Sequence, residues 1–322
     1  MSRYAVVDSG TTTTRLRLWH HGAVRWSGSV AAGARDTAIS GDNRAIREAV
    51  ADLLARVTSD TGARPSATIC SGMITSNLGL FEVPHLAAPA GPDELAAGIV
   101  HTTIEGVGAV SFVPGVKTLG AGLTLDTLAE GDVLRGEEAE VTGLRAHLGL
   151  SAPATFVHFG SHHKAVDVDA AGRITGSRTA VTGELLAATS EHTILRSSVV
   201  PLADLTLDLE AVHAGARATR EHGLGRALFL VRVGEQLAGI ARERMTSFLI
   251  GALSALDVPL LPPPSAGATI VLYGHGAFPE ALAALLATDG FEHVVRVDGE
   301  ASDRAAVEGA VALYERALGA RA

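Results

Sequence analysis

The chain has 322 residues, of which 47% are hydrophobic and 19% charged, and its formal net charge is −9 at pH 7. This composition supports a large buried core and excludes an intrinsically disordered chain. The acidic balance excludes a protein that binds nucleic acid or anionic membranes mainly by charge, because both partners require basic faces. Of the 26 basic residues, only Lys117 and Lys164 are lysines. Neither lies in a Gly-Lys-[Ser/Thr] or Val-Ala-Ile-Lys motif, which excludes P-loop and protein-kinase sites.

The sequence also predicts a cytoplasmic protein. No apolar run reaches the roughly 18 residues of a membrane span, and the first eight residues lack the pattern of a signal peptide. The one cysteine, Cys70, cannot form an internal disulfide or a thiolate metal cluster, and we expect it to be a small buried hydrophobe.

The chain opens with the pattern of a β-hairpin. Apolar residues 4–7 predict a strand, and residues 8–14 read Asp-Ser-Gly-Thr-Thr-Thr-Thr, a turn rich in hydroxyl groups. Residues 15–19 and 23–27 predict two further strands, separated by a turn at Gly22. Beyond them, apolar spacing predicts a helix over 43–59, and residues 67–70 predict a strand that leads into a polar loop.

The same design returns in the second half of the chain. Residues 155–176 again read strand, turn, strand, turn and strand, and three pairs share an offset of 150: Gly10 with Gly160, Thr11 with Ser161, and Gly22 with Gly172. A repeat of this length is a whole domain, because solenoid repeats are far shorter. We therefore predict two duplicated domains, 1–150 and 151–322, with a boundary near Pro153.

Strands and helices alternate along the rest of the chain, which predicts α/β architecture. The expected helices are 137–148, 183–195, 207–222, 234–256, 279–287 and 303–318, and the expected late strands are 269–273 and 293–297. Residues 262–265, Pro-Pro-Pro-Ser, predict a stiff surface linker.

Two turns carry residues suited to phosphate. In the first, Gly10, Thr11 and Thr12 could present backbone N–H groups and hydroxyls, and Asp8 could hold a hydrated Mg²⁺. In the second, Gly160, Ser161 and His162 precede Lys164, whose compact charge suits phosphate in a chain that otherwise uses arginine. For the first turn the alternative is an ordinary β-turn with local hydrogen bonds, and for Lys164 it is a tolerated surface residue. Metal binding by His162 and His163 is disfavoured, because neighbours on an extended segment point to opposite sides.

Three further segments could complete a site. Gly274 and Gly276 follow an apolar strand and would let a flat ligand approach the backbone, although Pro279 breaks a Rossmann pattern. Arg135 could bind a carboxylate, and Glu137 or Glu138 could act as a general base or could simply complement a helix dipole. The polar loop after Cys70 is suited to hydrogen bonding with polyol hydroxyls.

These motifs together resemble the actin/hexokinase/sugar-kinase superfamily, and within it the 2-keto-3-deoxygalactonate kinase family. The resemblance runs nearly end to end. It is most specific at Arg-Gly-Glu-Glu (135–138) and Thr-Gly-Glu-Leu (182–185), because generic sugar kinases lack both blocks. The family usually has Trp at the position of Ser9, Thr at Ser161, a small residue at His163 and Trp at Ala165.

The resemblance implies two actin-like (ribonuclease H-like) α/β domains, each opening with a β-hairpin, around a central nucleotide cleft. It also implies ATP- and Mg²⁺-dependent phosphorylation of the terminal hydroxyl of a 2-keto-3-deoxy sugar acid. The first domain would hold phosphate turn 1 and the sugar-acid site, and the second would hold phosphate turn 2 and the adenosine loop. The implied partners are the sugar acid and ATP, without nucleic acid or membrane, and a homodimer stays open.

The implied roles fall into four groups. Asp8 is the expected magnesium ligand, and Glu137, Glu138 and Lys164 complete the expected catalytic set. The nucleotide contacts are expected at Gly10, Thr11, Thr12, Gly160, Ser161, His162, Gly274 and Gly276. The sugar-acid contacts are expected at Arg15, Ser71, Met73, Ser76 and Arg135. Two alternatives remain: an ATPase or phosphatase-type enzyme, and a nucleotide-gated sugar-acid sensor.

Overall fold

The computed structural model describes residues 2–119 and 122–320, and these divide into two compact units. Unit 1 comprises Met1–Ala152, Asp169–Gly176 and Glu300–Ala322, and unit 2 comprises Pro153–Val168 and Ser177–Gly299. Both the units and the predicted domains change over near residue 150. The C-terminal helix, however, belongs to the first compact unit. The division of the chain into two duplicated domains, 1–150 and 151–322, stays a prediction.

Unit 1 is built on a six-stranded sheet with the order β3-β2-β1-β4-β7-β6. Its strands are β1 (Tyr4–Ser9), β2 (Thr14–His20), β3 (Ala23–Val30), β4 (Ala67–Gly72), β6 (Val100–Ile104) and β7 (Gly108–Phe112). A small sheet in the same unit has the order β5-β8-β9, formed by Leu86–Ala87, Val116–Thr118 and Asp132–Leu134. The predicted opening hairpin is therefore confirmed, whereas β5 to β9 were not expected.

The sheet of unit 2 has the order β12-β11-β10-β13-β14. Its strands are β10 (Ala154–Phe159), β11 (His163–Val168), β12 (Ile174–Ala180), β13 (Thr269–Gly274) and β14 (Val294–Arg296).

The two sheets share one topology. In each, the first strand is antiparallel to the second and parallel to a later strand, as β1 is to β4 and β10 is to β13. The order β3-β2-β1-β4 is matched by β12-β11-β10-β13. The offset of 150 holds between β1 and β10, whereas β4 and β13 differ by 202 residues, and the shared order supports duplication of one α/β unit.

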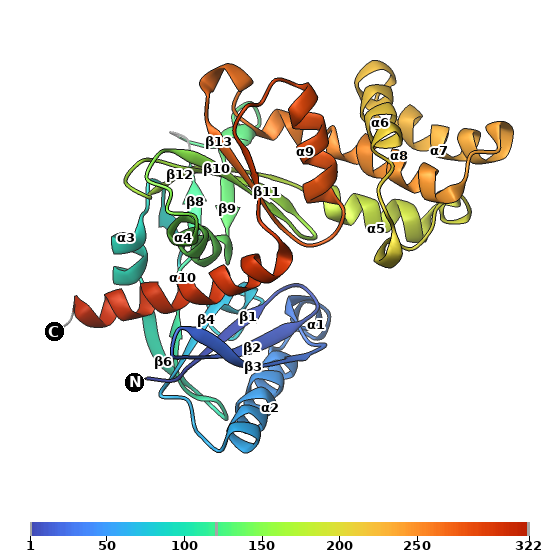
Figure 1. Cartoon of the computed structure of the whole chain (residues 1–322). Helices are drawn as coiled ribbons and strands as arrows, with labels where there is room; N and C mark the ends of the chain where they lie inside the picture. The colour runs from blue at the N-terminus through green and yellow to red at the C-terminus, as the bar shows by residue number, and fades with distance from the viewer. Residues whose placement is uncertain (1, 120–121, 321–322) are drawn as a thin grey trace. The chain divides into compact units, whose positions relative to one another are not determined.

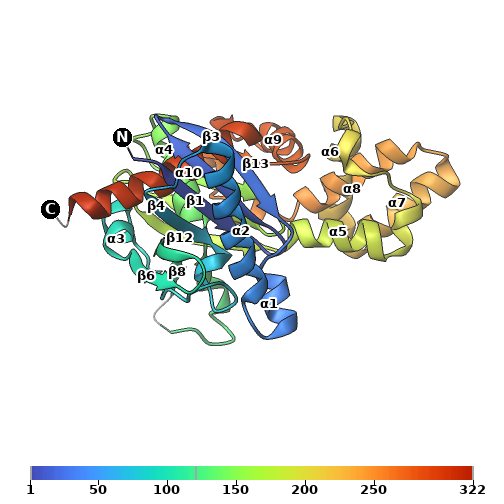
Figure 2. The same cartoon turned by 90° about the horizontal axis from the view of Figure 1, so that it is seen from below.

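Helices cover the sheets and connect their strands (Figure 1). Unit 1 contains α1 (Ala34–Ser40), α2 (Arg44–Thr61), α3 (Pro92–Ala97), α4 (Glu137–His147) and most of α10 (Gly299–Gly319). Unit 2 contains α5 (Thr182–His192), α6 (Leu209–His222), α7 (Leu224–Ala238), α8 (Arg242–Ser254) and α9 (Phe278–Thr288). Figure 2 shows α2 running along the sheet face beside β3, with α1 at one end of it. No helix in the described part of the chain is long and apolar enough to cross a membrane.

One expected helix is wrong. Residues 234–256 were predicted as a single helix, but they form the end of α7 and then α8. Gly239 adopts the left-handed conformation, with φ 64°, and its N–H donates to Gly234 O, which ends α7. The apolar period continues across this break, so hydrophobic spacing alone could not reveal it.

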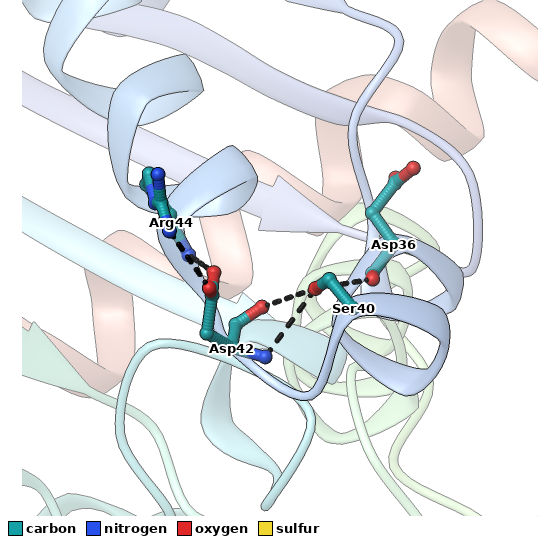
Figure 3. Close-up of polar contacts among 4 residues, drawn as sticks. All are labelled: Asp36, Ser40, Asp42 and Arg44. Atoms are coloured by element: carbon teal, nitrogen blue, oxygen red, sulfur yellow. Dashed lines mark hydrogen bonds and ion pairs between the residues drawn. The ribbon is translucent and has the colours of Figure 1, made fainter.

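The junction of α1 and α2 is held by a local polar network (Figure 3). The Ser40 hydroxyl donates to Asp36 O at 2.8 Å and lies 2.9 Å from Asp42 O. The Asp42 carboxylate in turn accepts from the backbone N–H and the guanidinium of Arg44, at 2.9 and 3.1 Å. These bonds to Arg44 lower the pKa of Asp42 and fix the point at which α2 begins.

Each unit has its own apolar core. In unit 1, Val7, Leu16, Val50 and Phe112 are fully buried between the sheet and α2. In unit 2, the core lies among β10, β13 and α5 to α9. Cys70 is fully buried, as expected, and burial raises the pKa of its thiol.

Helices α4 and α10 of unit 1 pack at van der Waals contact through small residues. A Cβ on Gly143 would lie 1.8 Å from Ala305 O, and one on Gly309 would lie 1.8 Å from Ala139 O. Only glycine allows this approach of the two backbones. The contact explains why the C-terminal helix belongs to unit 1.

Candidate functional site

The turn Gly10–Thr13 joins β1 to β2 and contacts the start of α1. Its carbonyl groups are used by that helix: Gly10 O accepts from Ala34 N at 3.1 Å, and Thr11 O accepts from Arg35 N at 2.8 Å. The first N–H groups of a helix need such acceptors, because the helix itself supplies none. The turn is therefore anchored through its oxygens.

Gly33 permits this packing and leaves the amides of the turn available. A Cβ on Gly33 would lie 2.6 Å from backbone atoms of Thr11 and Thr12. Within the described residues, the N–H groups of Thr11 and Thr12 donate to no protein acceptor. Adjacent free amides on a tight turn form a concave donor surface that suits an anion.

The second turn, Gly160–His162 between β10 and β11, is anchored in the same way. The Ser161 carbonyl accepts from Glu184 N at 2.9 Å, and a Cβ on Gly183 would lie 2.1 Å from Gly160 O. The N–H groups of Ser161 and His162 likewise have no protein acceptor in the described part of the chain. In both turns, a carbonyl thus accepts from the start of a following helix, and one glycine allows the close packing. The amides named above are left available for another ligand.

The sequence pattern did not identify Gly33 and Gly183 as site residues. A signal existed, because 183 − 33 is again 150, the offset that relates the turns themselves. What could not be read from the sequence is that each glycine touches the backbone of its turn.

Asp8 lies near the end of β1, directly before the first turn, and it is half-buried. Burial raises its pKa to about 6, with a further rise from Glu140 and a smaller one from Glu137. Arg17 and Arg15 oppose this rise. Arg15 is the cross-strand partner of Asp8, and Arg17 is ion-paired with Asp303 at 2.9 Å.

This environment fits a hydrated magnesium ion. A carboxylate whose charge is disfavoured by burial and by neighbouring acids is stabilised when a cation binds. In the part of the chain that the structure describes, no three His, Cys, Asp or Glu side chains group closely enough to hold a metal. Asp8 could therefore serve as one ligand, with the remaining ligands being water and phosphate, as magnesium prefers.

The predicted sugar-acid loop begins beside Asp8. In the parallel pairing of β1 with β4, Asp8 lies opposite Ser71. The chain then enters a 3-10 turn, Met73–Thr75, and the Ser76 hydroxyl donates to Met73 O at 2.7 Å. Ser71 and Ser76 are buried, so the loop is a compact element of unit 1.

Arg135 holds this loop in place. Its Nη1 donates to Thr75 O at 2.6 Å and to the Thr75 hydroxyl at 2.7 Å, and its Nη2 donates to Val83 O at 2.7 Å. Nη2 also lies 3.3 Å from Nδ1 of His85. Burial lowers the pKa of this half-buried guanidinium. Both terminal nitrogens thus have protein partners, and contact with a substrate carboxylate stays a prediction.

The two acids that follow Arg135 differ in their contacts. Glu138 is almost fully buried, and its oxygens accept from Val116 N and Gly136 N, both at 2.7 Å. Burial, with a contribution from Glu137, raises its pKa to about 7. Glu137 accepts from Arg135 N at 3.1 Å. Because both oxygens of Glu138 bind backbone amides, it ties β8 to the start of α4.

Unit 2 places the Gly274 loop beside the second turn. Gly274 pairs with Phe159, the residue before Gly160, and a Cβ on Gly274 would lie 2.7 Å from Phe159 O. Gly274 and Gly276 both have positive φ, 120° and 86°. The structure thus brings the predicted adenosine loop and the predicted second phosphate turn to one edge of one sheet.

Lys164 belongs to the same edge. It pairs with His158 across β11 and β10, and His158 pairs with Tyr273 across β10 and β13. The two histidines of the turn point apart, as expected: His163 is fully buried, whereas His162 is partly exposed and lies 3.4 Å from Glu184.

Comparisons with known proteins identify the family of the chain. A family model described as 2-keto-3-deoxy-galactonokinase matches residues 8–313. The 2-dehydro-3-deoxygalactonokinase of Escherichia coli is 28% identical over 259 residues, covering 80% of each protein. A relative from Rhizobium meliloti, named as a probable enzyme of this kind, is 30% identical over 263 residues, covering 79% of each.

Two solved structures are similar to this chain. One from Sinorhizobium meliloti, named as a 2-dehydro-3-deoxygalactonokinase protein, has a TM-score of 0.74 at 26% identity and covers 96% of this chain and 97% of its own. The activator of a 2-hydroxyisocaproyl-CoA dehydratase from Clostridium difficile shares the fold, with a TM-score of 0.54 at 11% identity, covering 99% and 97%. The chain belongs to the 2-keto-3-deoxy-galactonokinase family and is a sugar-kinase phosphotransferase.

Proposed function

We propose that this protein transfers the γ-phosphoryl group of ATP to the terminal hydroxyl of 2-keto-3-deoxygalactonate or a closely related keto-deoxy sugar acid. The observation that carries the proposal is the pair of turns at Gly10 and Gly160. Each presents N–H groups that have no acceptor among the described residues, and each is anchored through its carbonyls to a following helix. Phosphoryl transfer requires mainly positioning and neutralisation of charge, which such turns supply.

In this proposal each of the two turns binds phosphate oxygens of a nucleotide. The residues that act are Gly10, Thr11 and Thr12 in the first turn, and Gly160, Ser161 and His162 in the second. Lys164 adds a positive charge, and Gly274 and Gly276 pass close to the adenosine. When bound at Asp8, Mg²⁺ neutralises charge on the phosphate oxygens.

In this proposal the sugar acid contacts Ser71, Met73 and Ser76 of the loop after β4, and Arg15 on β2. Arg135 holds that loop, and it is also a candidate to bind the carboxylate of the acid. The predicted base is Glu137 or Glu138, and both carboxylates already accept backbone N–H groups: Glu138 from Val116 and Gly136, and Glu137 from Arg135.

Formation of ADP by the full chain, measured with and without a panel of keto-deoxy sugar acids, tests the function. The kinase predicts that ADP forms only with an acceptor and in equal amount to the phosphorylated acid. ADP formation at the same rate without an acceptor would indicate an ATPase. Saturable binding of nucleotide and acid without turnover would indicate a sensor.

A further inference from the structure

A buried hydrogen-bonded trio lies directly behind the second turn. Nδ1 of His163 lies 2.7 Å from Oδ2 of Asp257, and the Thr182 hydroxyl donates to Oδ1 of Asp257 at 2.6 Å. All three residues belong to unit 2 and none is more than 1% exposed. His163 begins β11, Thr182 begins α5, and Asp257 follows α8, so the trio joins three elements that are far apart in sequence.

The surroundings of the trio are apolar. The His163 ring packs edge-on against Phe159 and Phe278, with centroids 4.9 and 4.4 Å apart. Its Nε2 is buried and has no hydrogen-bond partner among the described residues. Apolar side chains of similar volume would fill such a place at lower cost, because buried charges and unpaired polar atoms are expensive. Unlike apolar side chains, the trio provides directional hydrogen bonds between its three elements.

That contact controls the two elements that hold the turn. Thr182 precedes Gly183 and Glu184, which contact the carbonyls of Gly160 and Ser161. His163 follows the turn directly and precedes Lys164. By bonding to both, Asp257 fixes the start of α5 relative to the start of β11. The Gly160–His162 turn is held by both of these elements. A shift of its backbone would therefore break one of the bonds to Asp257.

We propose that His163, Asp257 and Thr182 are positioning residues for nucleotide binding, acting through the Gly160–His162 turn and Lys164. This inference rests on the proposed function only in taking a nucleotide phosphate as the ligand of the turn.

The chain offers a matched control for Thr182. Thr155, also buried in unit 2, donates its hydroxyl to Oδ1 of Asp167 at 2.8 Å, and Arg178 completes that second network. Thr155 and Asp167 pair near the other end of β10 and β11, away from the turn. Thr182→Val and Thr155→Val therefore remove the same kind of bond from the same sheet, one beside the turn and one remote from it.

The experiment measures binding of Mg·ADP to both variants and to the wild-type protein by calorimetry, below the melting temperature of each. Both variants should melt at a lower temperature. Only Thr182→Val should weaken Mg·ADP binding, by about three- to tenfold, the effect of one hydrogen bond. Equal binding by the two variants, or a loss in both, would overturn the positioning role.

A second pair of variants covers the case in which Thr182→Val does not fold. His163→Asn keeps an N–H donor near the position of Nδ1, whereas His163→Leu keeps volume without a donor. We expect KM for ATP to stay near wild type in His163→Asn and to rise in His163→Leu, with KM for the sugar acid unchanged in both. An equal KM for ATP in the two variants would contradict the proposal.

The outcomes separate this inference from the proposed function. If the wild-type protein binds Mg·ADP but phosphorylates no keto-deoxy acid, the function fails and the binding comparison still decides the inference. If it phosphorylates the acid and Thr182→Val binds Mg·ADP normally, the inference fails alone. Wild-type protein that binds no Mg·ADP would overturn both.

Discussion

The α-carbon of Gly72 packs against the carboxylate of Asp8. A Cβ on Gly72 would lie 2.6 Å from Oδ1 of Asp8, and Gly72 has φ 83° and ψ −159°, a region that is nearly restricted to glycine. Gly136 also approaches Gly72 closely, since a Cβ there would lie 3.2 Å from the Gly72 α-carbon. The backbone of Gly72, at the end of β4, thus limits where the carboxylate of the proposed magnesium ligand can lie.

Replacing Gly72 by alanine should displace Asp8 as well as strain the backbone. We expect Gly72→Ala to lower kcat by about 100-fold or more, the scale of a lost charge-stabilising contact. Steady-state kinetics and thermal melting would measure the two effects separately.

Gly223 supplies the control for this variant. It has φ 77° and ψ 157°, also in the glycine region, and nothing lies within 4 Å of a Cβ placed there. Gly223→Ala should lower stability by about 1–3 kcal/mol from backbone strain and leave kcat unchanged. A similar loss of kcat in both variants would mean that strain, and not the Asp8 contact, is responsible.

Asp8→Asn should nearly abolish turnover without harming the fold. Because the pKa of Asp8 is raised from 3.8 to about 6, its charge disfavours the folded state, and wild-type stability falls as pH rises between these values. The asparagine variant lacks this loss, so at pH 7.5 and without ligands it should be as stable as wild type or more so. An unchanged kcat would rule out the assigned role.

The acid limb of the pH profile should depend on Glu140. Its charge is the largest influence on the pKa of Asp8 after burial. Glu140→Gln should lower that pKa, so the acid limb of kcat/KM should move from near 6 to lower pH. Glu105, whose side chain is 94% exposed, provides the control, and Glu105→Gln should leave the profile unchanged. If the acid limb of the kcat/KM profile stays at the same pH in Glu140→Gln, a group other than Asp8 controls it.

The two lysines allow a direct comparison. Lys164 follows the second turn, whereas Lys117 lies on β8 in the small sheet of unit 1. Lys164→Met should raise KM for ATP or lower kcat about tenfold, as expected for loss of one charge-assisted contact. Lys117→Met should change neither. Equal kinetics for the two variants would leave Lys164 without a role in phosphate binding.

Arg135→Lys should loosen the sugar-acid loop. One ammonium cannot replace the bonds that the guanidinium makes to Thr75 and Val83. We expect a loss of about 1–3 kcal/mol in unfolding free energy and a higher KM for the sugar acid, with little change in KM for ATP. Arg56→Lys, at an exposed i,i+4 pair with Asp52, should be neutral. A rise in KM for ATP alone would contradict this assignment.

Much of the fold could be predicted because it depends on local patterns. Strand periodicity and the Gly-rich turns lie within short windows of sequence, and the two sheets confirm the strands that they indicated. The prediction of one helix over 234–256 was wrong because it also depended on a local pattern, the apolar spacing. The break at Gly239 does not disturb that spacing.

The roles of individual polar groups depend on the tertiary structure. By itself, the sequence placed Asp8, the two turns and Lys164 at the ends of strands, and it predicted that one unit had been duplicated. Only the fold revealed that Arg135 binds Thr75, 60 residues away, that Glu138 binds the backbone of Val116, and that Asp257 binds His163 across 94 residues. A side chain's chemistry is encoded locally, but its hydrogen-bond partner is set by packing between segments far apart in the chain.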